Sequence, residues 1–489
     1  MNGPDDGDCF NITDAPTNIV IGRTAARPEV TAFRFTMEAE GRAAYRVRRR
    51  CTLVLWQSRP GLILAHVKQP PPHASPFETQ PPVSRRQSLA LYLLPALMDM
   101  VLSIVLFVGT VRTARLTHDT TRSACILAVW SLVYVLACPV VGRLISPARA
   151  PRFVLAGCLL CALTCGLLAL ASGFAPMLIL IGLVGVGMSL FFPAFQLLMK
   201  EMDGDGGLSV AHSVGLYTFA WSTGFACGPF VSGFLMQAGS GGAAGGEGFG
   251  WRLAFLFGSG ICLLMAIILS VVVRGRRPHA PVQAVAQTPD ETRYAGMPDL
   301  AWLGWLGAGV GFVSLAMLRS IFPVRAVGTE CHISAAMLGT IFFVLSIVQA
   351  VVGLMLKRSR YWMYRPLPVA GFAVAGLAGL LCFGLGVHPL AFLIGAGLFG
   401  IYSGSFCFYL VFHALVHPNR AGRYVAVNEA LVGLTGFLAP LAGGALADHC
   451  GSQYPYLVVA ALTIAVTALQ ICVHRARPGS MSASLEQTL

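Results

Sequence analysis

Apolar runs of about 20 residues recur along most of this chain, and each is long enough to cross a hydrocarbon core of about 30 Å as a helix. One clear example is LALYLLPALMDMVLSIVLFVGTV, between Arg86 and Arg112. Backbone groups in lipid have no water to bond, so such runs must be helical. Charges and turn residues divide the chain into twelve expected helices. Their predicted limits are 89–110, 121–141, 153–172, 176–199, 212–236, 253–273, 299–321, 334–356, 366–386, 389–415, 422–446 and 454–474.

The composition agrees with a multi-pass membrane protein in a lipid bilayer. Of 489 residues, 56% are hydrophobic and 11% are charged, whereas a soluble domain carries about 25% charged residues. Most of the 14 cysteines are scattered through the apolar runs. Cys158, Cys161 and Cys165 share a helical face, and we interpret them as small packing residues. We expect no metal, no cofactor and no disulfide framework.

The net charge of +13 follows the membrane topology. Lys and Arg concentrate in every second loop, which by the positive-inside bias places those loops and both termini in the cytoplasm of a cytoplasmic (inner) membrane protein. These charges flank apolar runs and form no single basic face, so we expect no nucleic-acid partner. The basic set is Arg143, Arg149, Arg152, Lys200, Arg274, Arg276, Arg277, Arg293, Lys357, Arg358, Arg360, Arg365, Arg420 and Arg423. The opposite loops hold chiefly Arg112, Arg115, Arg122, Arg252 and Arg325.

Residues 1–87 differ from the rest of the chain because they are charged, irregular and proline-rich toward their end. This composition predicts a disordered cytoplasmic tail. The apolar piece 51–67 is broken by Ser58-Arg59-Pro60-Gly61 and is too short to cross a membrane. The basic run 46–50, RVRRR, could instead contact anionic lipid.

A repeat relates the two halves of the apolar region. A shift of 211 residues brings Pro229 onto Pro440 and Ser232-Gly233 onto Gly443-Gly444. The same shift takes Gly142 to Gly353 and Arg149 to Arg360. This predicts two six-helix bundles, 88–273 and 299–474, joined by a cytoplasmic linker 274–298 and followed by a cytoplasmic tail 475–489.

The stretch GLYTFAWSTGFACGPFVSGFL, 215–235, places glycines and a proline inside an expected helix. In water each glycine would cost about 1 kcal/mol and the proline about 3 kcal/mol. In a membrane, small residues let helices approach closely, and a proline bends the helix. Taken alone, the glycines are explained by ordinary tight packing of helices. Because the pattern is repeated in the second half, we also interpret it as a surface along which neighbouring helices slide. The positions are Gly215, Gly224, Gly228, Pro229 and Gly233.

This stretch resembles the fifth-helix signature of the major facilitator superfamily, G-x8-G-x3-G-P-x2-G-G, with Ser232 in place of one glycine. GWRLAF, 250–255, is similar to the G-W-R-x-x-F that often precedes the sixth helix of that family. The resemblance covers about residues 88–474. It implies an all-α fold of twelve transmembrane helices in two pseudo-symmetric bundles, and the signature is commonest in proton-coupled exporters.

The loop after the second expected helix departs from the family pattern G-x-L-A-D-R-x-G-R-K. Here it reads GRLISPARAPR, in which Gly142, Leu144, Arg149 and Arg152 fit, but Ser146 replaces the acidic residue. In relatives that carboxylate helps to latch the outward-facing state. This chain lacks it at that position.

Two carboxyl groups inside the apolar runs are candidates for proton coupling, because an ionisable group in a membrane is costly and by default functional. Asp99 lies in the middle of the first run and could load and release a proton; first-helix acids serve this way in proton-driven members of the family it resembles. A structural hydrogen bond is the alternative. Glu429 could bind substrate or a proton, or pair with Arg420 or Arg423.

Further side chains are candidates for a substrate path. Arg319 would attract an anionic group or extend to the lipid headgroups. The resemblance implies that the fourth and tenth helices line the cavity, and the fifth adds wall residues. Aromatic and hydroxyl groups with few charges favour a neutral, amphiphilic or weakly ionised small molecule. The residues are Ser189, Phe192, Gln196, Tyr217, Trp221, Tyr402, Ser405 and Tyr409.

Together these features predict a monomeric secondary active transporter, driven by protons and exporting a small molecule by antiport. The alternatives are a symporter or uniporter for a sugar or organic anion, and a non-transporting membrane sensor with the same fold. The chain contains no G-x-x-x-x-G-K-[ST] loop for nucleotide. Its loops gather no cluster of His, Asp, Glu or Ser, so we do not expect an enzyme.

Overall fold

The computed structural model divides the chain into two compact units, Met1–Pro81 and Pro82–Leu489, which are described separately. The structure describes residues 19–24, 31–39, 47–57, 63–68, 85–203, 210–239, 248–274, 301–328, 331–356, 362, 365–415 and 421–475.

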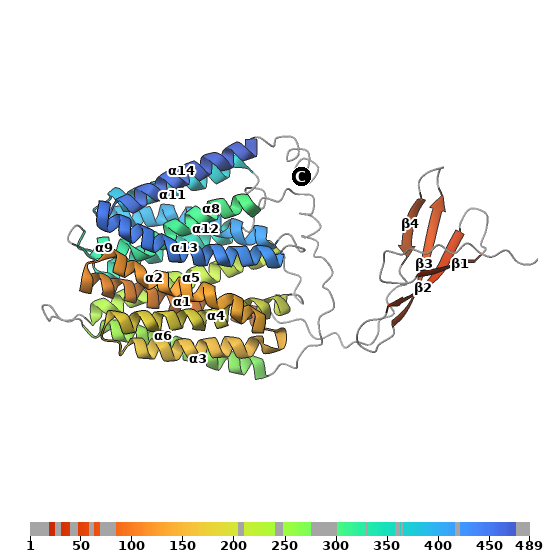
Figure 1. Cartoon of the computed structure of the whole chain (residues 1–489), viewed down its shortest axis with the longest axis horizontal. Coiled ribbons are helices and arrows are strands. Elements are labelled where there is room, and N and C mark those ends of the chain that lie inside the picture. Colours follow the sequence, from red (N-terminus) through yellow and green to blue (C-terminus); the bar gives the residue numbers. More distant parts are fainter. Residues whose placement is uncertain are drawn as a thin grey trace, which may run out of the picture. The chain divides into compact units, whose positions relative to one another are not determined.

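The first unit contains a four-stranded antiparallel sheet in the order β1-β2-β3-β4 (Figure 1). Its strands are β1 (Ile19–Thr24), β2 (Thr31–Ala39), β3 (Val47–Gln57) and β4 (Ile63–Lys68). The sequence analysis expected a tail without regular elements here. The break at Ser58–Gly61, which rules out a membrane helix, lies between β3 and β4, and both strands are rich in the β-branched and large apolar residues that favour sheets. The rest of the expected disordered tail lies outside the described residues.

The second unit is helical, with twelve long helices and the short α9 in the residues that the structure describes. Eleven of the long helices are apolar enough to cross a membrane, and the twelfth, α5, is richer in Ser, Thr and Gly. The chain is therefore a multi-pass membrane protein, and the twelve expected helices are confirmed. Their bounds are α1 Arg85–Thr117, α2 Thr120–Leu144, α3 Ala150–Leu168, α4 Phe174–Asp203, α5 Val210–Ala238, α6 Gly250–Arg274, α8 Ala301–Ser320, α9 Phe322–Val327, α10 Ala335–Leu356, α11 Pro366–Leu385, α12 Pro389–Leu415, α13 Ala421–Cys450 and α14 Tyr454–Arg475.

Helix pairing within α1–α6 is repeated within α8–α14. The contacts of α1 with α5, α3 with α4 and α3 with α6 correspond to those of α8 with α13, α11 with α12 and α11 with α14. The two bundles meet through α5 against α10 and α2 against α13. The fold is thus two pseudo-symmetric six-helix bundles, here called the first and second halves. Residues 275–298 of the expected linker and 476–489 of the expected tail lie outside the described residues.

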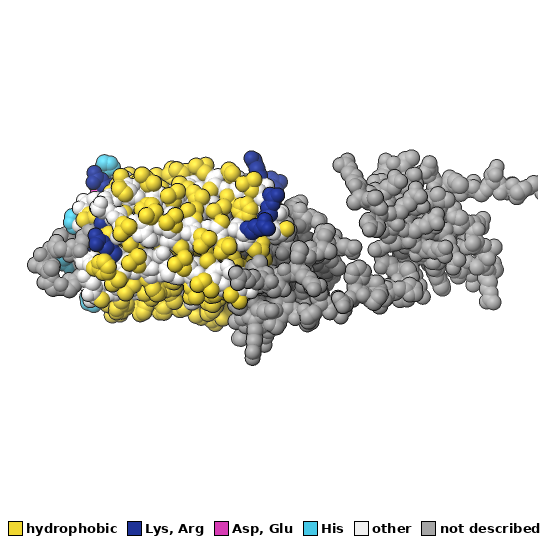
Figure 2. Space-filling model, turned by 90° about the horizontal axis from the view of Figure 1, so that it is seen from below, with side chains coloured by type: hydrophobic (Ala, Val, Ile, Leu, Met, Phe, Trp, Pro, Cys, Tyr) yellow, Lys and Arg dark blue, Asp and Glu magenta, His cyan; other side chains and the backbone are white. Residues whose placement is uncertain are grey.

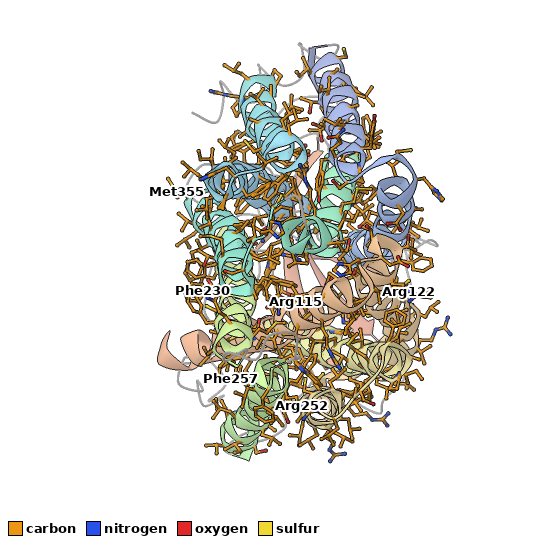
Figure 3. The ribbon with its side chains drawn as sticks, turned by 90° about the vertical axis from the view of Figure 1, so that its left-hand side faces the viewer. Arg115, Arg122, Phe230, Arg252, Phe257 and Met355 are labelled. Carbon is orange, nitrogen blue, oxygen red and sulfur yellow. The ribbon has the colours of Figure 1, made fainter. Side chains whose placement is uncertain are left out.

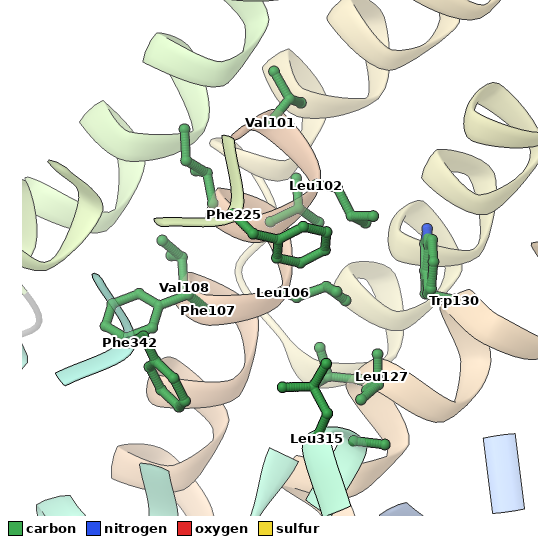
Figure 4. Close-up of a cluster of buried hydrophobic side chains, with 14 of the residues drawn as sticks. Val101, Leu102, Leu106, Phe107, Val108, Leu127, Trp130, Phe225, Leu315 and Phe342 are labelled. Carbon is green, nitrogen blue, oxygen red and sulfur yellow. The ribbon is translucent and has the colours of Figure 1, made fainter. Parts of the chain in front are cut away.

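The helix α1 forms the centre of the packed core. In its most apolar 18-residue window 83% of residues are buried, against 28% for α14, which lies at the periphery. Figure 4 shows its side chains, including Leu106 and Phe107, between Trp130 of α2, Phe225 of α5 and Phe342 of α10. Figure 2 shows one lateral face of the bundle, which is a broad hydrophobic surface with basic side chains toward both ends.

The glycines of α5 pack against two different helices. A Cβ at Gly224 or Gly228 would collide with the α1 backbone, and one at Gly233 would collide with Ala335 of α10 in the second half. The repeat-equivalent Gly444 likewise approaches Thr121 of α2 in the first half. Its neighbour Gly443 packs on α8. Equivalent positions of the repeat therefore make equivalent contacts between the halves.

Two arginines that the sequence analysis placed in loops are buried inside the bundle. Arg112 extends from α1, donates to the carbonyl of Ala171 beyond α3 at 2.8 Å and lies 3.7 Å from the ring of Trp251. Arg325 of α9 donates to the carbonyl of Phe383 at 2.7 Å and also to Gly384 and Gly386, at the end of α11. A cation at a helix C-terminus matches the helix dipole. These arginines therefore anchor corresponding helices in the two halves.

Candidate functional site

Ionisable and aromatic side chains from both halves meet between the bundles. The first half supplies residues from α1, α2, α4 and α5, and the second half supplies residues from α8 and α13. We call this group the central chamber, and define it by Asp99, Tyr134, Gln196, Tyr217, Phe225, Arg319 and Glu429. Figure 3 looks onto the bundle from the end where Arg115, Arg122 and Arg252 lie.

Asp99 lies in the middle of α1 with only 5% of its surface exposed. Its carboxyl accepts no hydrogen bond from any residue that the structure describes, so the structural hydrogen bond considered from sequence is not found there. The charged groups that act on it are the guanidinium of Arg319 and the carboxyl of Glu429, both from the second half. The hydroxyl of Tyr217, on α5, also lies within electrostatic range of Asp99.

Glu429 is held by neutral donors from the first half. The hydroxyl of Tyr134 donates to Glu429 Oε2 at 3.3 Å, and the amide of Gln196 donates to Oε1 at 3.4 Å. Both hydrogen bonds are long and therefore weak, and neither donor carries a charge. The pairing with Arg423 considered from sequence is not observed among the described residues, because the Glu429 side chain points toward α2 and α4. Arg420 lies outside them.

Arg319 turns toward the chamber. Its guanidinium carbon lies 3.9 Å from the centroid of the Phe225 ring, and Asp99 acts on its charge. Its Nη2 is buried and has no hydrogen-bond partner in the described part of the chain. The alternative that Arg319 extends to the lipid headgroups is therefore wrong, because the side chain is stacked on α5.

The remaining candidates of α4 and α5 divide between the chamber and helix packing. Tyr217 lies beside Gln196, and Trp221 packs edge-on against Phe225 at 6.1 Å. Phe192 packs edge-on against Tyr134 at 6.5 Å. Ser189 is fully buried and donates to the carbonyl of Val186 in its own helix at 2.7 Å, as a packing residue would.

The candidates of α12 do not reach the central chamber. Tyr402, Ser405 and Tyr409 line a groove inside the second half, together with Trp362 and Gln470. The Ser405 hydroxyl donates to the carbonyl of Tyr402 at 2.7 Å. Their place in a substrate path stays a prediction.

Of the candidate conformational positions, Gly142 lies near the end of α2, and Arg149 ends a short 3-10 turn, Pro147–Arg149, directly before α3. A Cβ at Gly142 would meet no atom within 4 Å, and Arg149 is exposed. Gly215 is buried in α5, and Pro229 and Pro440 lie inside α5 and α13. Gly142, the glycine of the GRLISPARAPR motif, therefore makes no tight contact with another helix.

The sequence analysis did not identify Tyr134 and Phe225, because nothing in the sequence distinguishes these two from the many other aromatic residues of the apolar runs. It also missed a buried polar link between the halves. The amide of Gln349 on α10 donates to the hydroxyl of Ser222 on α5 at 2.7 Å, and the Ser403 hydroxyl of α12 donates to the Gln349 carbonyl. All three residues are fully enclosed or nearly so. The sequence does carry one sign of this link, because Gln349 is a polar residue inside the eighth expected helix, 334–356.

The cysteines of α3 are packed inside the first half. Cys158, Cys161 and Cys165 are fully buried, with Cys262 of α6 beside them. Among the described residues no group of three or more His, Cys, Asp or Glu could hold a metal ion.

A family comparison decides what kind of bundle this is. The Major Facilitator Superfamily model matches residues 89–417. The chain belongs to the major facilitator superfamily. No curated protein matches it.

Solved structures of superfamily members share its fold. A bacterial homolog of the human lysosomal transporter Spinster, in an inward-facing and unoccupied conformation, has a TM-score of 0.57 and 15% identity, covering 79% of this chain and 96% of its own. The nucleoside transporter NupG has a TM-score of 0.56 and 11% identity, covering 79% of this chain and 98% of its own. At these identities the likeness concerns the fold.

Proposed function

We propose that this superfamily member is a secondary transporter in which proton exchange at Asp99 drives the movement of an amphiphilic small molecule by antiport. Membership in a superfamily of small-molecule transporters supports the general function. One observation supports the coupling: Asp99 belongs to the first half, whereas the two charges that act on it, Arg319 and Glu429, belong to the second. The charge state of Asp99 therefore affects how strongly the halves attract each other across the chamber.

The size of this attraction indicates how coupling would work. Two unit charges 4 Å apart interact by about 4 kcal/mol at an effective dielectric constant of about 20. No ion pair within 4 Å joins Asp99 to a described residue, so the interaction here is weaker. Reversing a two-state population from 1:99 to 99:1 takes about 5.5 kcal/mol. A proton on Asp99 therefore supplies only part of the free energy that reverses the orientation of the halves. Substrate binding must supply the rest of that free energy, and obligatory coupling requires both contributions.

The chamber offers a substrate both aromatic surface and polar groups. Tyr134, Tyr217 and Phe225 supply rings, while Gln196 and Glu429 supply polar atoms. Such a site suits amphiphilic compounds. We place both chain termini on the cytoplasmic side, so that export runs from the end where α1 begins to the end where α1 meets α2.

Flux in proteoliposomes tests this function. Purified full-length protein is reconstituted with an inside-acid pH gradient, and uptake is followed for tetraphenylphosphonium (a cation), norfloxacin (a zwitterion) and chloramphenicol (a neutral compound). Antiport predicts that the gradient drives uptake of at least one probe and that nigericin abolishes this uptake. Counterflow that ignores the gradient would instead support a uniporter, and binding without flux would support a sensor; either result contradicts the proposal.

A further inference from the structure

The sheet of the first unit has two chemically different faces. Paired residues of neighbouring antiparallel strands share a face, and successive residues of one strand alternate between the faces. Phe35 of β2 pairs with Ile21 of β1 and with Cys51 of β3, so these three positions share one face. We call this the apolar face, and its central positions are Phe33, Phe35, Met37, Cys51, Leu53 and Leu55.

The opposite face is basic. Its larger apolar residues, Trp56 and Leu64, are paired with each other near the end of β3. Its charged positions are Arg34, Glu38, Arg48, Arg50 and Lys68. The sheet therefore separates an apolar surface from a surface that carries a net positive charge.

The apolar face has charged positions only at its margin. Arg23 lies on the edge strand β1, and Arg49 lies on β3 beyond the last pair that β3 makes with β4. The basic run considered for contact with lipid is thus divided, because Arg48 and Arg50 belong to the basic face. An apolar centre with a polar rim is the usual anatomy of a protein interface.

The apolar face needs a second layer, because a sheet with one hydrophobic face must bury it against another element. Within this unit the structure describes the four strands only, and they form a single layer. The remaining residues of the unit contain no apolar run that could supply the second layer; they are 1–18, 25–30, 40–46, 58–62 and 69–81. The cover must therefore come from outside the unit.

The placement of the charges argues against lipid as this cover. Insertion of the apolar face into a membrane would put Arg34, Arg48 and Arg50 on the far side of the sheet, away from the phosphate groups that attract basic residues. It would also bring the unpaired backbone groups of the edge strands β1 and β4 to the lipid. A second sheet avoids both costs, because the basic face then stays in water.

An identical sheet matches this face in size. Its strands have 6 to 11 residues. Four such strands, spaced about 4.8 Å apart, cover about 500 Å², and two opposed faces bury about 1,000 Å², the size that a specific interface must reach. The linker 69–84 joins β4 to α1 and spans at most about 55 Å when fully extended. Copies in one membrane therefore hold their sheets in the same thin layer, which raises their effective concentration.

We propose that two copies of this protein dimerise by packing the apolar faces of their N-terminal sheets against each other, with the basic faces outward. A two-fold axis makes this contact self-complementary, because each copy supplies the same face. Such a dimer differs from the monomer expected from the sequence, where residues 1–87 were predicted to be disordered. The inference does not depend on the proposed transport cycle.

Light scattering and a distance measurement on the purified full-length protein test this inference. In detergent, we expect the wild type to have the mass of two chains. A spin label at Thr36, on the basic face, introduced as an unnatural amino acid, should report an intermolecular distance below about 40 Å, because opposed sheets lie about 10 Å apart. A monomeric wild type, or a dimer that lacks this distance, would overturn the inference without any change to the apolar face.

Two variants at adjacent positions of β2 identify the face that makes the contact. Phe35→Glu places a charge in the middle of the apolar face and should weaken dimerisation by about 100-fold or more, because an unpaired buried charge is strongly unfavourable. Thr36→Glu introduces the same charge on the basic face and should leave the dimer intact, since neighbouring positions of a strand lie on opposite faces. A Phe35→Glu protein that stays dimeric would place the contact elsewhere in the chain and overturn the inference. Equal dissociation of both variants would also contradict a contact through the apolar face.

Discussion

Asp448 and Thr121 are joined by two hydrogen bonds although 327 residues separate them. The carboxyl of Asp448, near the end of α13, accepts from the backbone N–H of Thr121 at 3.0 Å and from its hydroxyl at 2.6 Å. It also accepts from the backbone N–H of Thr120 at 3.2 Å. A residue of the second half thus caps the first turn of a helix of the first half. This link closes the interface between the halves at the end where α1 meets α2.

Replacing Asp448 by alanine should favour separation of the halves at that end. Loss of a helix-capping side chain typically costs about 0.5–2 kcal/mol, and here the cost falls only on the state in which this link is made. We expect the distance distribution between labels at Arg122 and Tyr454, introduced as unnatural amino acids, to shift toward longer values. An unchanged distribution would mean that Asp448 does not contribute to closure.

Asp119 provides the control for this experiment. It caps the same helix from within the first half, with its carboxyl accepting from the backbone N–H of Arg122 at 2.8 Å. Asp119→Ala should weaken the start of α2 without separating the halves. If both variants shift the labels equally, fraying of α2 and not the link between halves is responsible.

The glycine contacts between the halves should not tolerate a side chain. A Cβ at Gly233 would collide with the backbone of Ala335, which cannot move aside as a flexible side chain could. We expect Gly233→Ala to lower the free energy of unfolding by about 1–3 kcal/mol, as overpacking does. Gly397→Ala on α12 is the control, because a Cβ there meets no atom within 4 Å, and it should be neutral or stabilising by up to about 1 kcal/mol. Equal melting temperatures for the two variants would contradict the close approach.

The anchoring role of Arg325 predicts a loss of stability without a loss of coupling. Arg325→Met removes charge-assisted hydrogen bonds to three carbonyls at the end of α11, each worth about 1.5–3 kcal/mol. The melting temperature should fall clearly, whereas the ratio of protons to substrate moved should stay the same. Arg152→Met changes an exposed arginine of α3 and should alter stability by no more than about 0.5 kcal/mol. A changed coupling ratio in Arg325→Met would argue against a purely structural role.

The link through Gln349 predicts a non-additive result. Gln349→Leu leaves the buried hydroxyls of Ser222 and Ser403 without their shared partner, which costs about 1–3 kcal/mol. Adding Ser222→Ala and Ser403→Ala removes the unpaired groups and should recover part of this loss. Denaturation of the single and triple variants measures the difference. A triple variant less stable than Gln349→Leu would contradict the buried link.

Helix positions could be predicted from the sequence, because the length of an apolar run and the charges at its ends are local properties. The twelve expected helices match the observed ones, although α1 runs on to Thr117 since Arg112 is buried against Trp251 and does not end the helix. Asp99 was identifiable for the same reason: it is an acid in the middle of an apolar run.

The partners of the site residues could not be predicted, because periodicity shows which residues share a helix face but not which neighbour that face meets. Tyr402, Ser405 and Tyr409 do share a face of α12, and the structure turns it toward a groove of the second half. From the sequence, Glu429 could bind substrate or a proton or pair with nearby arginines, whereas its observed partners, Tyr134 and Gln196, lie more than 230 residues away. Contacts of that kind depend on how the two halves dock.

Gradient-driven uptake by Asp99→Asn in proteoliposomes is the most direct test of the central claim that Asp99 couples proton movement to transport. The measurement compares the wild type, Asp99→Asn and Asp119→Asn, with the probe that the wild type takes up best. Coupling through Asp99 predicts that Asp99→Asn loses accumulation driven by the pH gradient but keeps exchange at equal pH, while Asp119→Asn behaves as the wild type. Full gradient-driven accumulation by Asp99→Asn would contradict the account.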